Sequence, residues 1–302
     1  MSAELARLIA CHVFLHACMA GMRMASPLWA LRQGYGPLPV GVLLALFALA
    51  SVFLALPSGR FADRHGLKRP AGLSIIATVA GALLPVIFQS FGAMCLGALL
   101  SGAATGTISI AVQRHVGRAA QDATDLKRVF SWLAIGPSIS NFCGPLAAGL
   151  LIDHAGVWSG GQAGDATGFR AAFLLLALVP LASWLGLRHT RELPGAAGST
   201  DTTPRNALQL LRSVKMRRLI FISWVMSSCW DVHTFLVPLI GNEKGFSASV
   251  IGTILASFAL AATCVRVLMP LLAARLREGA VVSMAMLTTG IMFGLYPFMP
   301  SA

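Results

Sequence analysis

Nine long apolar runs separated by short polar connections constrain the fold of this chain more than any other feature of its sequence. The runs lie at about 6–31, 38–57, 71–89, 92–113, 129–152, 171–188, 219–240, 249–272 and 280–298. A helix needs about 20 mostly apolar residues to cross the hydrocarbon core of a bilayer. The sequence therefore predicts an all-α, polytopic membrane bundle with nine spanning helices.

The composition agrees with a chain whose solvent is mostly lipid. Charged residues make up only 11% of the 302 positions, whereas a soluble domain carries about 25%. The net charge of +12 does not favour a nucleic-acid partner, because the cations recur in short clusters between the apolar runs instead of forming one basic domain. The six cysteines lie within apolar runs and lack metal-ligand spacing, so we expect no metal and no disulfide. Motifs for hydrolysis, phosphate binding or dinucleotide binding are absent from the sequence, which favours neither an enzyme nor a cofactor.

The basic residues also predict an orientation in the membrane. If the N-terminus is cytoplasmic, 18 of the 23 Lys and Arg residues fall in cytoplasmic segments, three on the opposite side and two within spans. Cytoplasmic loops of membrane proteins carry an excess of Lys and Arg. We therefore expect a multi-pass protein of the cell membrane with a cytoplasmic N-terminus.

A polar hairpin between the second and third runs carries the most specific motif. It reads Gly-x-x-x-Asp-Arg-x-Gly-x-Lys-Arg, with its motif residues at Gly59, Asp63, Arg64, Gly66, Lys68 and Arg69. This pattern resembles the signature between helices two and three of the major facilitator superfamily (MFS) of secondary transporters. The resemblance implies that Asp63 contacts the second lobe and helps to latch the outward-open state.

The same resemblance implies a two-lobed organisation. Residues 1–190 would form a six-helix N-terminal lobe, 191–217 a cytoplasmic linker with an amphipathic segment, and 218–302 three helices of a C-terminal lobe. The usual family member has twelve spans, so we expect a C-terminally truncated member. Helix eleven, which would engage Asp63, lies beyond this sequence.

The fifth and fourth runs contain further patterns. In the fifth, Gly136-Pro137 predicts a bend, because proline removes a helical hydrogen bond. Gly144, Pro145 and Gly149 resemble a segment of the proton-coupled antiporter branch of the superfamily, although a packing kink would need the same residues. In the fourth run, polar residues recur every four positions beside a Gly-x-x-x-Gly pair, a pattern that predicts close helix packing (Ser101, Thr105, Ser109 and Gln113 beside Gly102 and Gly106). This stripe would face a watery cavity, or its hydroxyls would bond to their own helix.

Ionisable residues within spans are costly and are functional candidates by default. His12, His16 and Arg23 share one face of the first helix at about 100° per residue. Asp231 is the only acidic residue well inside a span. A carboxyl group at low dielectric readily holds a proton, so Asp231 is a candidate protonation site. Arg23 would contact substrate or pair with Asp231, or both residues would lie near the outer surface and only stabilise the fold. A proton relay through His12 and His16 is a weaker candidate role.

These features predict an MFS-type secondary transporter, with proton-coupled efflux of small organic compounds as the favoured activity. An uptake symporter or uniporter for sugars or organic anions is the alternative within transport. A truncated, transport-incompetent membrane protein is the alternative from another class. The expected partners are a small-molecule substrate, protons and the lipid bilayer, and the pattern defines no oligomeric state.

Overall fold

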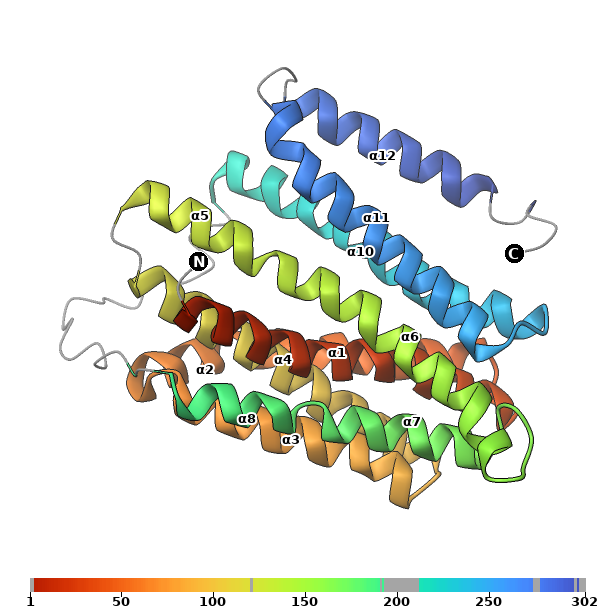
Figure 1. Ribbon diagram of the computed structural model, residues 1–302. Helices are drawn as coiled ribbons and strands as arrows, with labels where there is room; N and C mark the ends of the chain where they lie inside the picture. Colours follow the sequence, from red (N-terminus) through yellow and green to blue (C-terminus); the bar gives the residue numbers. More distant parts are fainter. Residues whose placement is uncertain are drawn as a thin grey trace. The chain divides into compact units, whose positions relative to one another are not determined.

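The computed structural model describes residues 3–119, 122–190, 192, 212–273, 278–295 and 298, which form helices joined by short turns (Figure 1). No strand occurs among these residues. Within the same ranges, eight helices are long and apolar enough to cross a membrane, and the predicted ninth span coincides with a shorter apolar helix at Ala280–Leu295. The all-helical, polytopic prediction is therefore confirmed.

The chain divides into two compact units. The first comprises Met1–Ser199 and Thr234–Ala261, and the second comprises Thr200–His233 and Ala262–Ala302. The first unit contains α1 (Ala3–Arg32), α2 (Pro37–His65), α3 (Lys68–Ile87), α4 (Phe91–Ala119), α5 (Ala123–Leu133), α6 (Ile135–Trp158), α7 (Ala166–Leu178) and α8 (Leu181–Arg188). It also contains the end of α10 (Val214–Glu243) and the start of α11 (Ala248–Ala273).

The second unit contains the rest of α10 and α11 together with α12 (Glu278–Leu295). Most of the predicted linker, including its amphipathic segment up to residue 211, lies outside the described residues. The lobe boundaries at 190 and 218 therefore stay predictions.

Two of the predicted spans are each divided into two helices. The fifth is divided at Ala134 into α5 and α6, just ahead of Gly136-Pro137. The sixth is divided at 179–180 into α7 and α8, where Pro180 stands. Proline has no backbone N–H and clashes with the preceding turn, so it interrupts the helical hydrogen bonds. The first of these bends follows the sequence expectation, and the second was not predicted.

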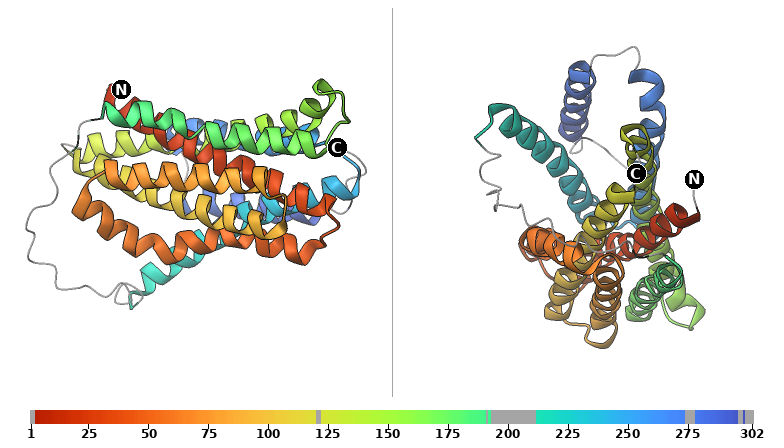
Figure 2. Two further views of the ribbon diagram at one scale, coloured as in Figure 1. Left: turned by 90° about the horizontal axis from the view of Figure 1, so that it is seen from below. Right: turned by 90° about the vertical axis from the view of Figure 1, so that its left-hand side faces the viewer.

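Packing in the first unit is organised around α4 and α1. Helices α2 and α3 each pack closely along α4, and α6 packs along α1 (Figure 2). Gly102 and Gly106 make the approach of α2 possible, because a Cβ at Gly102 would overlap the Phe47 backbone and one at Gly106 would lie 2.9 Å from Ser51 Oγ. The predicted close-packing role of this glycine pair is confirmed.

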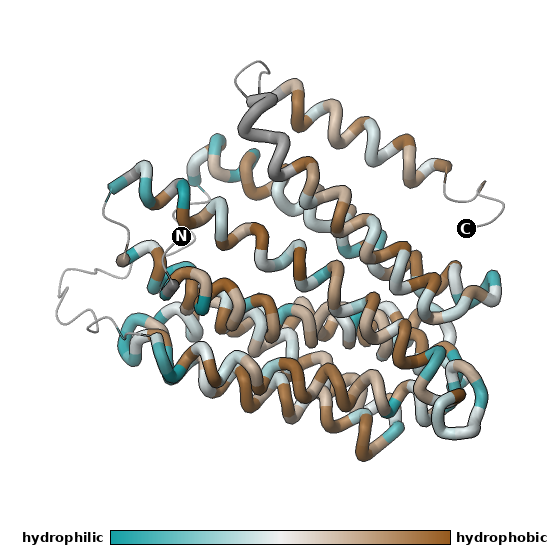
Figure 3. Tube along the Cα trace, viewed as in Figure 1, coloured by the Kyte–Doolittle hydropathy of each residue, from teal (hydrophilic) through white to brown (hydrophobic). Residues whose placement is uncertain are grey.

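Two apolar clusters fill the interior of the first unit. One surrounds Met22, Phe47 and Phe173, and the other lies nearer the hairpin, around Leu15, Leu67 and Ile108. Apolar residues also cover the outward faces of the helices, while polar residues gather at the helix ends (Figure 3). Apolar side chains on both the inner and outer faces are typical of helices that cross a bilayer.

Candidate functional site

The predicted hairpin is largely helical. Helix α2 continues past its apolar run to His65, and α3 begins at Lys68, so the turn itself is only Gly66 and Leu67. Gly66 has φ +72° and ψ −151°, a backbone conformation that is essentially restricted to glycine. The spacing of the motif thus places its first half on the last two turns of α2.

Asp63 lies on this helical end and accepts a hydrogen bond from Arg114 of α4, forming an ion pair within the first unit. Gly59, one turn earlier, is buried beneath the same guanidinium group, whose Nη1 would lie 3.0 Å from an added Cβ. A larger residue at position 59 would therefore push Arg114 away from Asp63. The latch to a second lobe that the family resemblance implies for Asp63 stays a prediction.

The remaining cations of the motif differ in exposure. Arg64 and Arg69 are exposed, and Lys68 is half-buried. None of the three forms an ion pair with the part of the chain that the structure describes. Arg64 instead lines a groove between α2 and α3.

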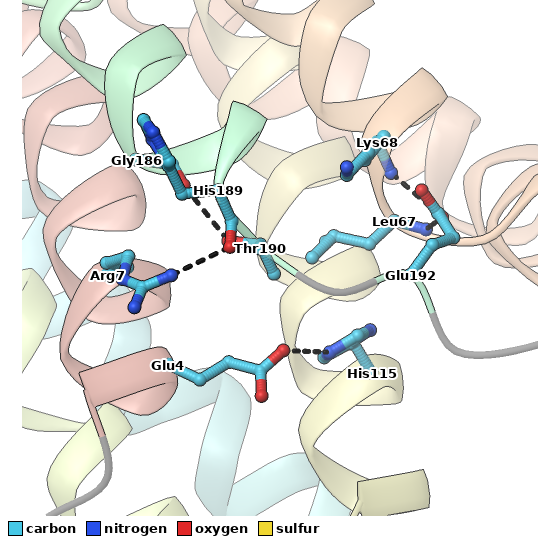
Figure 4. Close-up of polar contacts among 9 residues, drawn as sticks. All are labelled: Glu4, Arg7, Leu67, Lys68, His115, Gly186, His189, Thr190 and Glu192. Atoms are coloured by element: carbon cyan, nitrogen blue, oxygen red, sulfur yellow. Dashed lines mark hydrogen bonds and ion pairs between the residues drawn. The ribbon is translucent and has the colours of Figure 1, made fainter.

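Glu192, which the sequence analysis missed, also contacts the hairpin, at Leu67 and Lys68 (Figure 4). Its Oε1 accepts hydrogen bonds from the backbone N–H groups of Leu67 (2.5 Å) and Lys68 (3.1 Å), at the start of α3. A carboxylate there satisfies free N–H groups and complements the helix dipole. A Cβ at Gly66 would overlap this carboxylate. The sequence did offer a signal for this contact, because Glu192 is an isolated acidic residue among the cations that follow the sixth span.

Further polar contacts connect the helices at the same end of the first unit (Figure 4). Arg7 Nη1 of α1 donates to the carbonyl oxygen of His189 at 2.7 Å, and Glu4 Oε1 lies 4.0 Å from His115 Nε2 of α4. The Arg7 and Glu192 contacts fix the segment after α8 against α1 and α3, and the Glu4–His115 contact joins α1 to α4.

The antiporter-like motif of α6 forms a tight seam with two helices. A Cβ at Gly144 would overlap the backbone of Ala17 on α1, and one at Gly149 would overlap that of Ala248 on α11. From the α11 side, a Cβ at Gly252 would lie 2.6 Å from the carbonyl oxygen of Pro145. The motif therefore brings α6 into backbone contact with both neighbours.

Asp153, one turn beyond this motif, caps the start of α11. Its carboxylate accepts hydrogen bonds from the N–H groups of Ala248 (3.1 Å) and Ser249 (2.7 Å). The Ser249 hydroxyl donates in turn to the carbonyl oxygen of Gly149 at 3.2 Å. Helix α11 is thus bound to α6 by polar contacts as well as by close packing.

A part-buried polar cluster occupies the junction of α1, α4 and α6. We call His12, His16, Ser109 and Asn141 the histidine cluster. His12 Nε2 lies 2.7 Å from Ser109 Oγ, His16 Nε2 lies 3.4 Å from Asn141 Nδ2, and the two ring centroids are 5.6 Å apart. The Nδ1 atoms of both rings are buried without a hydrogen-bond partner among the described residues.

Bonding to the helix's own backbone is confirmed for the first half of the polar stripe on α4, while the watery cavity stays a prediction. Ser101 and Thr105 donate to carbonyl oxygens of their own helix, at 2.8 Å each. Ser109 instead belongs to the histidine cluster, and Gln113 is exposed. The stripe is therefore structural in its first half and reaches a candidate site in its second.

The other candidates on the spans are divided between the units. Arg23 Nη2 donates to Thr234 Oγ1 at 3.2 Å, and both residues belong to the first unit. Asp231 is exposed and belongs to the second unit, so its predicted pairing with Arg23 stays a prediction. Among the described residues, no three His, Cys, Asp or Glu side chains gather as metal ligands would.

Helices long and apolar enough to cross a membrane, with a charged hairpin clamped by Arg114 and Glu192, define a polytopic membrane protein. The family profile described as "Major Facilitator Superfamily" matches residues 8–302. The chain belongs to this superfamily, as the hairpin motif predicted.

Two curated relatives come from Escherichia coli. The chain is 27% identical over 229 residues to the tetracycline resistance protein, class B, covering 73% of this chain and 53% of the relative. It is 25% identical over 200 residues to the fosmidomycin resistance protein of strain K12, covering 65% and 47%. The chain thus spans about half the length of these relatives.

Solved structures of the nucleoside transporter NupG share the fold. The D323A mutant aligns with a TM-score of 0.64 at 15% identity, over 90% of this chain and 68% of that one. A second structure of NupG aligns with a TM-score of 0.60 at 13% identity, over 90% and 66%. Sequence identities this low support a shared fold and nothing further.

Proposed function

We propose that this chain is a proton-coupled exporter of small organic compounds in the cell membrane, with its N-terminus in the cytoplasm. The observation that carries the proposal is the seam along α6. The glycines of an antiporter-like motif meet α1 on one side and α11 on the other. The contacts are so close that neither neighbour leaves room for a Cβ at these glycines. The curated relatives, which are named for resistance to tetracycline and fosmidomycin, support the direction of transport.

The seam suits a carrier that moves by rigid-body rocking of helices. Glycine contacts let backbones meet without intervening side chains that would have to rearrange during the movement. Alternating access in secondary transporters is largely such a rocking of one bundle against another around a central site. In this mechanism α6 is the helix against which α1 and α11 move. The bend at 134–137 lets the first part of α6 move together with α5.

The histidine cluster and Arg23 supply the polar surface of the proposed site in the first unit. Buried ring nitrogens cost free energy unless they are paired. The two Nδ1 atoms of His12 and His16 are therefore suited to accept a hydrogen bond from a substrate. Arg23 offers a cation for an anionic group of the substrate. Asp231 is proposed as the residue whose carboxyl group binds and releases the coupling proton.

A two-direction transport assay tests this function. Cells that express the 302-residue chain should accumulate less tetracycline than cells with an empty vector, and a protonophore should abolish the difference. An uptake carrier would raise accumulation instead. Equal accumulation in both strains, with the chain present in the membrane, would contradict transport of this compound.

A further inference from the structure

We infer that a groove between α2 and α3 binds an anionic phospholipid of the leaflet at the hairpin. The groove has a volume of about 640 Å³. It exists because α2 and α3 both pack on α4 but touch one another much less. Small residues on its walls and floor keep it open, namely Ala77 of α3 and Ala103 and Ala104 of α4.

The two ends of the groove differ in chemistry as the two ends of a phospholipid do. Its apolar part, farther from the hairpin turn, is bordered by Leu54 of α2 and Ala77 of α3, and Leu54 is 40% exposed and so faces the surroundings of the bundle. Its other end is lined by Arg60, Arg64 and His65, on the last turns of α2. An acyl chain fits the first part, and a phosphate group fits the second.

The cations at the mouth are not neutralised within the described chain. No acidic residue lines the groove there, and neither Arg60 nor Arg64 forms an ion pair with a described residue. The nearby carboxylate of Asp63 is bound to Arg114 instead. Basic pockets between membrane helices on the cytoplasmic side are typical sites for anionic lipid headgroups.

A second observation inside the groove also points to a ligand. Ser74, on the α3 wall, is only 2% exposed, and its hydroxyl has no hydrogen-bond partner among the residues that the structure describes. The neighbouring hydroxyls of Ser58 and Thr107 are paired with each other at 2.8 Å. A lipid ester oxygen below the phosphate is an acceptor of the kind that Ser74 lacks.

Quantitative mass spectrometry of bound lipid tests this site without measuring transport, so its outcome is independent of the proposed function. The full chain is reconstituted in mixed phosphatidylcholine and phosphatidylglycerol, purified in neutral detergent, and its bound lipids are compared with the bulk. Each cation near the phosphate contributes about fivefold in affinity. We expect phosphatidylglycerol to be enriched at least about fivefold, and R60Q/R64Q to remove that enrichment.

The matched control is K68Q/R69Q, which removes the same charge from the same hairpin at residues that do not line the groove. It should leave the enrichment unchanged, whereas A77L, at a half-buried wall position, should lower the amount of both lipids bound. Equal losses in the two double variants would overturn the proposal, because general surface charge would then explain the binding. Equal retention of both lipids by the unaltered chain would overturn it as well.

Discussion

Asp63 at the end of α2 is paired with Arg114 of α4, and the two side chains remain 41% and 45% exposed. Ion pairs this exposed contribute at most about 1 kcal/mol to stability. The pair therefore contributes little to stability. If breaking it has a large effect on transport, that effect must come from a changed balance between conformations.

Replacing Asp63 by Asn should accordingly change the free energy of unfolding by less than about 1 kcal/mol while it lowers the transport rate. Reversible unfolding in mixed micelles and initial rates of tetracycline transport measure the two effects. The charge reversal D63R/R114D restores an ion pair and should recover part of the rate lost in either single variant. A double variant no better than the worse single one would show that this pairing has no role in transport.

Gly66 and Glu192 should depend on each other. Gly66→Ala places a Cβ in a backbone region that costs about 1–3 kcal/mol, and that Cβ also displaces the Glu192 carboxylate. Glu192→Ala should cost about 1 kcal/mol, because two N–H groups of α3 lose a charged acceptor. In the double variant Glu192 is absent, so the added Cβ at position 66 no longer displaces a carboxylate. The losses of unfolding free energy in the two single variants should therefore sum to more than the loss in the double variant. Strictly additive losses in unfolding experiments would contradict the contact.

The seam between α6 and α11 should be sensitive to small changes. Gly252→Ala brings a methyl group to within 2.6 Å of a backbone oxygen and should destabilise the chain by about 1–3 kcal/mol. Gly92→Ala is the control, because a Cβ at this position on α4 meets nothing within 4 Å. Thermal unfolding compares the two variants, and equal melting temperatures would refute the tight seam.

The Asp153 cap can be tested separately. Asp153→Asn keeps the shape of the side chain but removes the charge that faces the start of α11, which should cost about 0.5–1 kcal/mol. Because that end of α11 belongs to the first unit, hydrogen exchange should rise at residues 248–252 and stay constant in α3. A uniform rise across both helices would mean that the substitution loosens the unit generally and does not act through the cap.

Within the histidine cluster, Ser109→Ala leaves the buried Nε2 atom of His12 without its partner. The expected loss is about 1–3 kcal/mol, the usual penalty for a buried polar group left unpaired. Ser101→Ala removes a hydroxyl of the same helix that bonds only to its own backbone, and should cost less. If both variants unfold at the same denaturant concentration, the contact between α1 and α4 contributes nothing.

Sequence reasoning succeeded where a local pattern has one steric solution. Gly66 sits in a turn, and Gly102 and Gly106 meet the neighbouring helix α2, so each could be placed from its neighbours in the chain. It also predicted that His12 and His16 share a face of α1.

It failed where the partner lies far away in the sequence. Glu192 is 125 residues from Leu67, and Asp153 is 95 residues from Ala248. A lone carboxylate has many basic or N–H partners available until the topology is known, and no periodicity selects among them. The position of the α7–α8 break was missed because the apolar run through Pro180 continues without a polar residue to mark it.

Transport in everted membrane vesicles tests both proton-coupled export and the proposed role of Asp231 as the proton-binding residue. With an imposed pH gradient, vesicles that contain the chain should accumulate tetracycline, and Asp231→Asn should abolish gradient-driven accumulation. Glu243→Gln, at the last residue of the same helix, is the matched control and should keep it. Gradient-driven accumulation that survives in Asp231→Asn would contradict the role of this carboxyl group, and accumulation that ignores the pH gradient would contradict proton coupling itself.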